Sequence, residues 1–179
     1  MDQASIIAAV TAGDRDAFGR IVEAESGAVF RTCYRILGRV DEAEDAVQET
    51  FVSAFRSLDT FRGEGSLSAW LARIATRLAL RRLGQRRLVV SLDPIAHDRP
   101  EQGPDPLGAA LAAERGERLR AAVAALPDPY REVVALRFFA ECSLAEIADA
   151  TGRPLATVKT HLRRGLLRLR QALGEEAAA

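Results

Sequence analysis

The sequence has few cysteines and histidines and no long apolar run, which limits the metal centres, disulfide frameworks and membrane spans that it could form. It contains two cysteines and two histidines in 179 residues. Cys33 and Cys142 lie far apart with no Cys or His at ligand spacing, so we expect buried thiols, no metal site and no cofactor. No apolar run approaches the roughly 20 residues of a membrane-spanning helix. Because no charged-then-apolar leader follows Met1, we expect a cytoplasmic protein without a signal peptide.

Strand-like alternation and net charge are also missing. No segment alternates apolar and polar residues as a half-buried β-strand would. The apolar content is 48%, which at this length is typical of one ordinary folded domain or two small ones. The 25 basic and 25 acidic residues give a formal net charge of zero, which ordinarily argues against nucleic-acid binding. The two signs are segregated along the chain, however, so each segment has its own charge.

The first two helices are predicted from apolar periodicity and from residues that suit helix ends. One spans about Asp14 to Leu37 and ends at Gly38. The next begins with Asp41 as its N-cap and carries a continuous apolar stripe. A second face of this helix points away from the stripe and is strongly acidic: Glu42, Asp45, Gln48, Glu49 and Val52. Taken alone, that face is a solubilising surface.

A third helix is striped with arginine. It begins at Leu67, after the loop "DTFRGEGS", and one of its faces is apolar. Arg73, Arg77 and Arg81 recur at every fourth position and therefore lie along another face. Trp70 belongs to the apolar face, and we interpret it as a core residue rather than a base contact.

A proline-rich stretch divides the sequence. Four of the seven prolines lie between Ser91 and Leu107, together with several acids. Such a stretch cannot stay helical or bury much surface, which is typical of a linker. We therefore expect an all-α fold of two small helical domains, residues 1–88 and 108–174, joined by a flexible linker over 89–107.

The second half of the sequence has the pattern of four helices. The first covers about Leu107 to Leu126, with Leu119 facing inward, and the second begins with Pro129 at its first position. The string "SLAE" at 143–146 is a capping box for a short third helix. Pro154 begins the last helix, which carries Lys and Arg residues and no acid as far as 173.

The short helix, a turn at Gly152 and the longer last helix have the spacing of a helix-turn-helix. The outer residues near the start of the last helix are all polar or basic: Thr157, Lys159, Thr160, Arg163 and Arg164. Such side chains can neutralise phosphates or contact base edges in a major groove. A solvated basic face is the alternative interpretation, and the pattern alone leaves both open.

Two long stretches together resemble a known family. "DEAEDAVQETFVSAFRSLDTFRGEGSLSAWLARIA" resembles region 2 of an extracytoplasmic-function (ECF, group IV) RNA polymerase sigma factor, and "LPDPYREVVALRFFAECSLAEIADATGRPLATVKTHLRRGLLRLRQAL" resembles its region 4. The order of the two stretches, the linker between them and the length are similar to the two-domain form of that family. The resemblance covers most of the chain.

The resemblance implies a non-enzymatic transcription initiation factor. Its expected partners are core RNA polymerase, promoter DNA and an anti-sigma factor. The acidic face (Asp45, Gln48, Glu49 and Val52) would dock onto a coiled coil of the largest polymerase subunit, and region 4 would meet the flap region. By the same resemblance, the final helix would read the minus-thirty-five element through Thr157, Lys159, Thr160, Arg163 and Arg164.

The resemblance also assigns a minus-ten surface. Its residues would be Phe61, Arg62, Ser66, Arg73, Thr76 and Arg77. They would clamp phosphates and hold a base flipped from the opened strand, a step that costs a few kcal/mol. The sequence departs from the family at Arg77, where asparagine is frequent, so base selection there is expected to differ.

Two other classes of function compete with a sigma factor. A free-standing helix-turn-helix regulator would use the last helix equally well, but it leaves the acidic helix and the arginine-striped helix unexplained. A nucleic-acid enzyme is disfavoured, because the sequence has no P-loop, no metal cluster and no nucleophile paired with a base.

Overall fold

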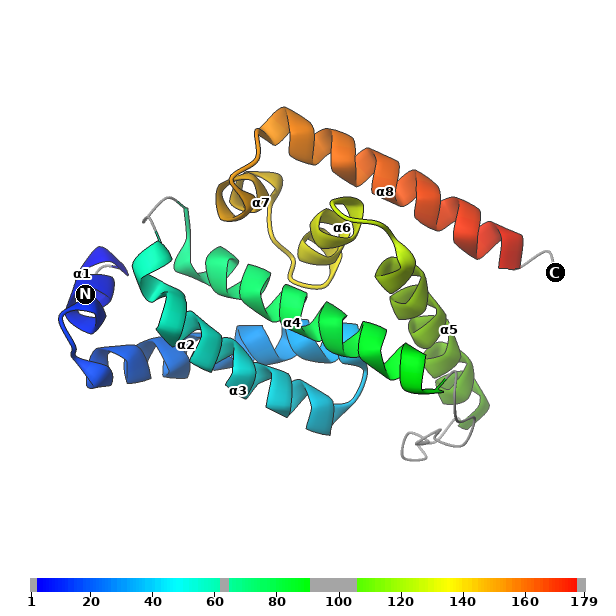
Figure 1. Cartoon of the computed structure of the whole chain (residues 1–179). Coiled ribbons are helices and arrows are strands. Elements are labelled where there is room, and N and C mark those ends of the chain that lie inside the picture. The colour runs from blue at the N-terminus through cyan, green and yellow to red at the C-terminus, as the bar shows by residue number, and fades with distance from the viewer. Residues whose placement is uncertain (1–2, 62–64, 91–105, 177–179) are drawn as a thin grey trace.

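The computed structural model describes residues 3–61, 65–90 and 106–176, and all regular structure within these ranges is helical (Figure 1). The elements are α1 (Gln3–Thr11), α2 (Arg15–Leu37), α3 (Val40–Ser57), the 3-10 turn η1 (Leu58–Thr60), α4 (Leu67–Val90), α5 (Pro106–Ala125), α6 (Tyr130–Phe138), α7 (Leu144–Thr151) and α8 (Leu155–Glu176). The all-α prediction is confirmed. Most of the predicted linker and Arg62 lie outside the described residues.

Helix α2 begins and ends at the residues that its sequence predicts. Asp14 accepts hydrogen bonds from the amides of Asp16 and Ala17 at 2.9 and 3.1 Å, which satisfies two free donors of the first turn. Gly38 closes the helix at φ 76°, a left-handed conformation that glycine adopts without a Cβ clash. Helix α1, which sequence periodicity did not predict, packs against α2.

The predicted N-cap of α3 is wrong by two residues. Arg39 has the extended N-cap backbone, and α3 begins at Val40, so Asp41 lies inside the first turn. Its carboxylate accepts hydrogen bonds from the Arg39 guanidinium at 3.2 and 3.3 Å. That contact, with a further hydrogen bond from the backbone of Glu42, lowers the pKa of Asp41. An acid in the first turn still favours the helix dipole, which explains why the pattern resembled a cap.

The C-terminal helices follow the predicted order with two corrections. Pro129 is the N-cap of α6 rather than its first residue, and the helix begins at Tyr130. Leu119 of α5 is 41% exposed and does not face inward. The capping box of α7 is confirmed: the Ser143 hydroxyl accepts from the Glu146 amide at 3.2 Å, and the Glu146 carboxylate accepts from the Ser143 amide at 2.8 Å.

Helices α6 and α8 approach closely at one glycine. A Cβ on Gly165 would lie 2.6 Å from Cγ2 of Val134, so only a residue without a side chain fits there. Tyr130 of α6 lies under the same helix and stacks beneath the guanidinium of Arg168, 5.1 Å from the ring centre. These contacts hold α8 along the top of α6, as Figure 1 shows.

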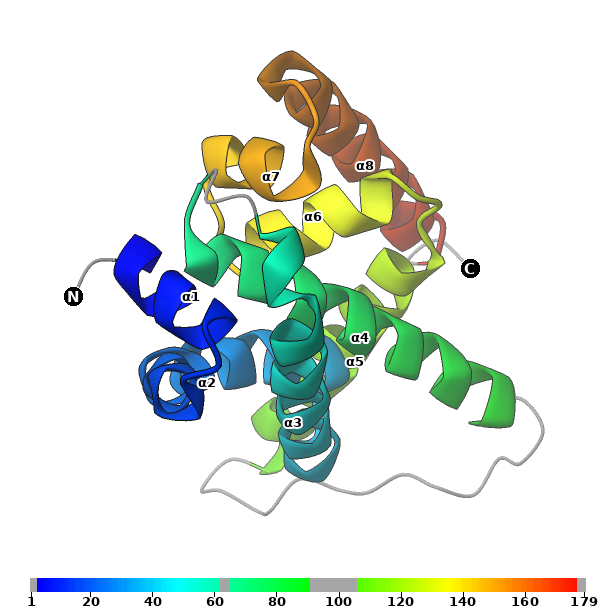
Figure 2. The same cartoon turned by 60° about the vertical axis from the view of Figure 1, so that its left-hand side comes forward.

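The two halves pack against each other, and α4 lies between them (Figures 1 and 2). On one side it contacts α2 and α3, and on the other it contacts α5, α6 and α7. One continuous apolar cluster includes Leu71 of α4, Ile36 of α2 and Phe139 beyond α6. The face of α4 that was expected to bind DNA is therefore close to the C-terminal helices α6 and α7.

None of the described helices has the length and apolar content needed to cross a bilayer. The described residues also bring together no group of three or more His, Cys, Asp or Glu side chains that could hold a metal ion. Cys33 and Cys142 are both buried and free, as the sequence predicts, and burial raises the pKa of each thiol to about 11.

Candidate functional site

The basic residues of α8 point into solvent. Lys159, Arg163 and Arg164 are all exposed, and within the described part of the chain none of them forms an ion pair or a side-chain hydrogen bond. Val158, which precedes Lys159, lies on the inner face of the helix and is completely buried. Among the described residues, the structure thus presents three unpaired cations along the first three turns of a helix that packs by its opposite side.

Two predicted threonines share this surface to different degrees. Thr160 is exposed, and its hydroxyl donates to the Ala156 carbonyl at 3.0 Å, which leaves the oxygen free to accept. Thr157 is half-buried at the start of the helix. Both lie in the first two turns of α8, shortly after Gly152, which ends α7 in a left-handed conformation at φ 65°.

His161 is a packing residue rather than a ligand. Its ring meets the Tyr130 ring edge-on at 5.6 Å, and its Nδ1 atom is buried without a hydrogen-bond partner in the described structure. Burial lowers the pKa of His161, and the nearby charges of Arg153 and Arg164 lower it further. The imidazole is therefore neutral at physiological pH and adds no charge to the basic surface.

The predicted minus-ten residues are not equally accessible. Arg77 is exposed. Phe61 is 9% exposed and packs against Trp70, with ring centres 5.5 Å apart, so Trp70 is part of the packing as the sequence indicates. Ser66 and Arg73 are half-buried and contact α7 through Glu146 and the Ala150 carbonyl.

Thr76 does not lie on the surface of α4. It is completely buried, and its hydroxyl has no hydrogen-bond partner in the described structure. In this conformation the Thr76 side chain points into the bundle and away from the exposed Arg77, so its contact with promoter DNA stays a prediction. The spacing of residues along α4 did not indicate that Thr76 is buried while its neighbour Arg77 is exposed.

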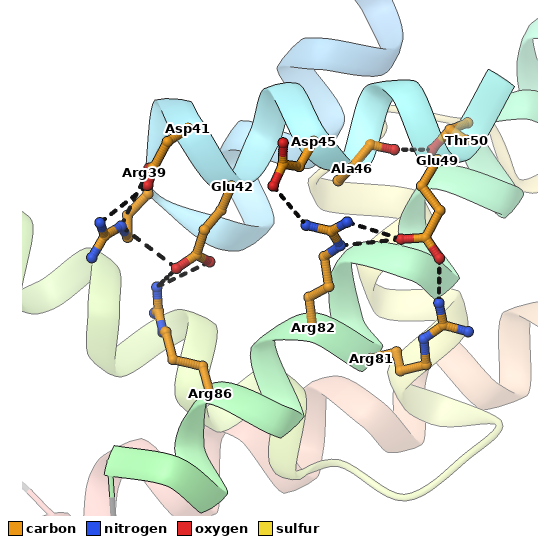
Figure 3. A network of polar contacts seen from close by, with 10 residues as sticks. All are labelled: Arg39, Asp41, Glu42, Asp45, Ala46, Glu49, Thr50, Arg81, Arg82 and Arg86. Atoms are coloured by element: carbon orange, nitrogen blue, oxygen red, sulfur yellow. Dashed lines mark hydrogen bonds and ion pairs between the residues drawn. The ribbon is translucent and has the colours of Figure 1, made fainter. Parts of the chain in front are cut away.

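Arginines of α4 and acids of α3 form a ladder of ion pairs, shown in Figure 3. Glu49 accepts from Arg81 at 2.5 Å and from Arg82 at 3.0 and 3.2 Å. Arg82 also lies 3.5 Å from Asp45, and Arg86 lies 3.5 Å from Glu42. We call these contacts the α3–α4 ladder. Arg81 therefore belongs to the N-terminal bundle rather than to a free arginine stripe.

The ladder leaves part of the acidic face available. The Asp45 side chain is 69% exposed, whereas that of Glu49 is 35% exposed and held by two arginines. Gln48 is exposed, and Val52 is 50% exposed. Sequence analysis missed Phe55, which is 46% exposed one turn after Val52 and rests edge-on against Phe18 at 5.0 Å. Its position three residues after Val52, on the same side of the helix, is the signal that could have identified it.

Two family models match the chain, one in the N-terminal helices and one in the C-terminal helices. Residues 21–88 match the family described as Sigma-70 region 2. Residues 116–169 match the family described as Sigma-70, region 4. The first match contains α3 and most of α4, and the second contains the helix-turn-helix.

Individual relatives extend the likeness over almost the whole chain. The ECF RNA polymerase sigma factor SigW of Bacillus subtilis (strain 168) is 35% identical over 173 residues, 92% of this chain and 92% of SigW. The solved structure of CnrH in complex with the cytosolic domain of CnrY has a TM-score of 0.61 at 24% identity, covering 95% of this chain and 96% of CnrH. The sigma factor RpoE of Bartonella quintana, solved with the anti-sigma factor NepR, has a TM-score of 0.53 at 22% identity, covering 88% and 96%.

These likenesses explain the two unlike surfaces together. A free basic helix beside a turn suits promoter DNA, and an acidic and apolar helix face in the preceding domain suits a protein partner. Region 2 and region 4 occur in the family's order, and the match to SigW spans both. The chain belongs to the ECF RNA polymerase sigma factors, which direct RNA polymerase to promoters.

Proposed function

We propose that this protein is a group IV sigma factor that binds core RNA polymerase and selects promoters through both the minus-ten and the minus-thirty-five elements. The observation that carries this proposal is the coexistence of three unpaired cations on α8 with an exposed acidic and apolar face on α3. A free-standing helix-turn-helix regulator would need only the first of these surfaces.

Helix α8 is the proposed reader of the minus-thirty-five element. Lys159, Arg163 and Arg164 are exposed and unpaired among the described residues, so a phosphate or a guanine edge meets no internal competitor. Thr160 and the half-buried Thr157 are placed to hydrogen-bond a phosphate at the start of the helix.

Helix α4 and the turn before it carry the proposed minus-ten surface. Arg77 is exposed and available, and Ser66 and Arg73 lie beside it on the side of region 4. Phe61 is proposed to support this surface, because its buried ring packs against Trp70 at the start of the turn. Arg62, which follows Phe61 in the sequence, is proposed to belong to the same minus-ten surface.

The exposed part of α3 is the proposed docking face for polymerase. Asp45 and Gln48 supply polar contacts for a basic coiled coil of the largest subunit, and Val52 with Phe55 supplies an apolar patch. Glu49 is proposed to act on the same face, although its charge is already balanced by Arg81 and Arg82. Region 4 would contact the flap region.

The remaining assignments follow from the family and from a solved neighbour. Because RpoE of Bartonella quintana was solved with an anti-sigma factor, we propose that an anti-sigma factor also regulates this protein. A sigma factor acts on polymerase without catalysing a reaction of its own, so we propose a non-enzymatic protein that works in the cytoplasm.

Reconstitution with core RNA polymerase tests the proposal. The purified protein is mixed with core enzyme, and the transcripts that begin after its overproduction are mapped to define a cognate promoter. We expect stable complex formation and specific initiation from that promoter in vitro. A protein that binds its DNA site tightly as a dimer and never associates with core polymerase would instead be a free-standing regulator.

A further inference from the structure

Arg168 lies on α8 beyond the residues assigned to the minus-thirty-five element. It occupies the fourth turn of the helix, four residues after Arg164 and therefore on the same side of it. Its side chain is exposed, and it forms no ion pair among the described residues. This cation is therefore available to an anion outside the protein.

The ring of Tyr130 lies under Arg168. The guanidinium carbon is 5.1 Å from the ring centre, which is the distance of a cation–π contact. Tyr130 begins α6 and is itself held against α8: the ring of His161 meets it edge-on at 5.6 Å, and a Cβ on Gly165 would lie 3.4 Å from its own Cβ. These three positions of α8 recur at helical spacing, so one side of the helix rests on the ring. Tyr130 is thus a fixed support for Arg168.

Arginines elsewhere in the fold are held differently. Nε of Arg73 donates to Glu132 at 3.1 Å, and Arg153 donates to the other oxygen of the same carboxylate at 2.8 Å. Burial alone would raise the pKa of Glu132, but the hydrogen bonds from the two arginines lower it, so the carboxylate is charged at neutral pH. Arg120 of α5 is half-buried over the turn that ends α2, where a Cβ on Gly38 would lie 2.7 Å from its guanidinium. In this conformation, these three arginines are engaged within the protein.

An aromatic ring holds a guanidinium without consuming it. The attraction comes from the negative face of the ring, so the positive charge of Arg168 is not neutralised as it would be by a carboxylate. The contact also needs none of the five N–H donors of the group, which can still form the forked pair of bonds that suits a phosphate. Because the ring restricts the side chain before DNA arrives, less conformational entropy is lost on binding. Arg168 is therefore a charged donor that is already in place.

The position of Arg168 fits a phosphate better than a base edge. In a helix-turn-helix, the N-terminal residues of the second helix enter the major groove. Arg168 lies about 20 Å along the axis from the start of α8, beyond those residues. Helical spacing places it on the same flank as Thr157 and Arg164. Since a major groove is about as wide as a helix with its side chains, a flank of the helix lies beside the phosphates of one strand.

We propose that Arg168 and Tyr130 form a phosphate clamp, in which the Tyr130 ring holds the Arg168 guanidinium against one backbone phosphate beside the minus-thirty-five element. The inference rests on the proposed function, because it assumes that α8 lies in the major groove at that element. Arg168 supplies affinity without reading sequence. Tyr130 acts through Arg168 and is a positioning residue.

The first variant to test is Arg168→Gln, which removes the charge at an exposed position and keeps a helix-forming side chain. Holoenzyme made with each protein binds a duplex of the mapped promoter over a range of salt concentrations, and fluorescence anisotropy gives the affinity. We expect affinity to fall about five- to tenfold at low salt and the salt slope to fall by about 1. Promoters with altered minus-thirty-five bases should lose the same factor. Arg115→Gln removes a charge from an exposed position of α5 and should change neither quantity.

Variants of Tyr130 test the positioning role. Tyr130→Phe keeps the ring face and should bind as the wild type does. Tyr130→Leu keeps apolar packing against Gly165 without a ring, and should weaken binding about two- to fivefold. In an Arg168→Gln background, Tyr130→Leu should cause no further loss, because the contact is already absent. Equal losses in both backgrounds would show a purely structural ring and overturn the positioning role.

The clamp and the proposed function fail in different ways. A normal holoenzyme in which Arg168→Gln keeps its affinity and salt slope would overturn the clamp alone. A loss confined to the cognate promoter would also overturn it, because that result would indicate a base contact. A wild-type protein that forms no holoenzyme with core polymerase would refute the proposed function, and the clamp with it.

Discussion

The cations of α4 and α8 are similar in number and spacing, yet they are engaged very differently. On α4, Arg73, Arg81, Arg82 and Arg86 each pair with a carboxylate of another helix. On α8, the exposed Lys159, Arg163 and Arg164 have no such partner among the described residues. The difference shows that a basic stripe identifies a DNA-binding surface only when the acids that could neutralise it are located as well.

Removing the acid that both halves share should have the largest effect on stability. Glu132→Gln leaves Arg73 and Arg153 without their counter-charge and should lower the free energy of unfolding by about 2 to 3 kcal/mol. This is less than for a fully buried pair, since the arginine side chains are 30% and 28% exposed. Urea denaturation measures it. Glu114→Gln, exposed on α5, is the control and should stay within about 0.5 kcal/mol of wild type.

Truncating the exposed cations of α8 should weaken DNA binding without changing the stability of the protein. Arg163→Ala or Arg164→Ala should weaken binding of the holoenzyme to the minus-thirty-five element by about 1 to 3 kcal/mol if the side chain contacts a base. The same variants should unfold within about 0.5 kcal/mol of wild type, because neither residue is paired. Promoter variants separate the two kinds of contact, since loss of a phosphate contact weakens all sequences alike. Unchanged binding in the double variant would remove α8 from promoter recognition.

Charge reversal on α3 should separate docking from folding. Asp45→Arg should weaken core polymerase binding about tenfold, or about 1.4 kcal/mol. The free energy of unfolding of this variant should change little. Glu49→Arg should also cost about 1 to 2 kcal/mol of stability, because it places a third cation beside Arg81 and Arg82. Surface plasmon resonance and urea denaturation give the two quantities. Equal effects of both variants on both measurements would mean that the α3–α4 ladder does not distinguish these acids.

Low pH should weaken the contact between the two halves by protonating Glu132. This is the smallest of the effects predicted here. Its folded pKa is lowered below the ordinary value of 4.5, so its contribution is fully present above that value and is lost as pH falls through the folded pKa. Arg73 and Arg153, which face it, stay charged throughout. The free energy of unfolding, measured between pH 6 and pH 3, should therefore decrease less steeply for Glu132→Gln than for wild type. Identical slopes would assign acid sensitivity to other carboxylates.

Local signals predicted much of the fold. The start of α2 near Asp14, its end at Gly38 and the Ser143 capping box were all recognisable because each depends on residues within one helical turn. The Asp41 cap was predicted wrongly because an acid is favoured both at the N-cap and in the first turn, and the choice was settled by the extended backbone of Arg39. Helix α1 was missed because its apolar residues are not confined to one face.

The state of the candidate site could not be predicted in the same way. The exposed face of α8 follows from its own periodicity, since Val158 is buried and its neighbours are not. The partner of Arg73 is 59 residues away in sequence, and that of Arg81 is 32 residues away. Such pairings depend on how whole helices pack, so helical spacing gave the stripe but not the ion pairs that occupy it. The burial of Thr76 has the same origin.

The contact of Arg120 with the Gly38 turn also has a mechanical consequence. The contact between region 4 and region 2 runs from Ser66 and Glu146 at one end to Arg120 and Gly38 at the other. A body in contact at both ends cannot pivot about one end without leaving the other. Any partner that opens this protein must therefore act on both ends of the contact, either at once or in a defined order.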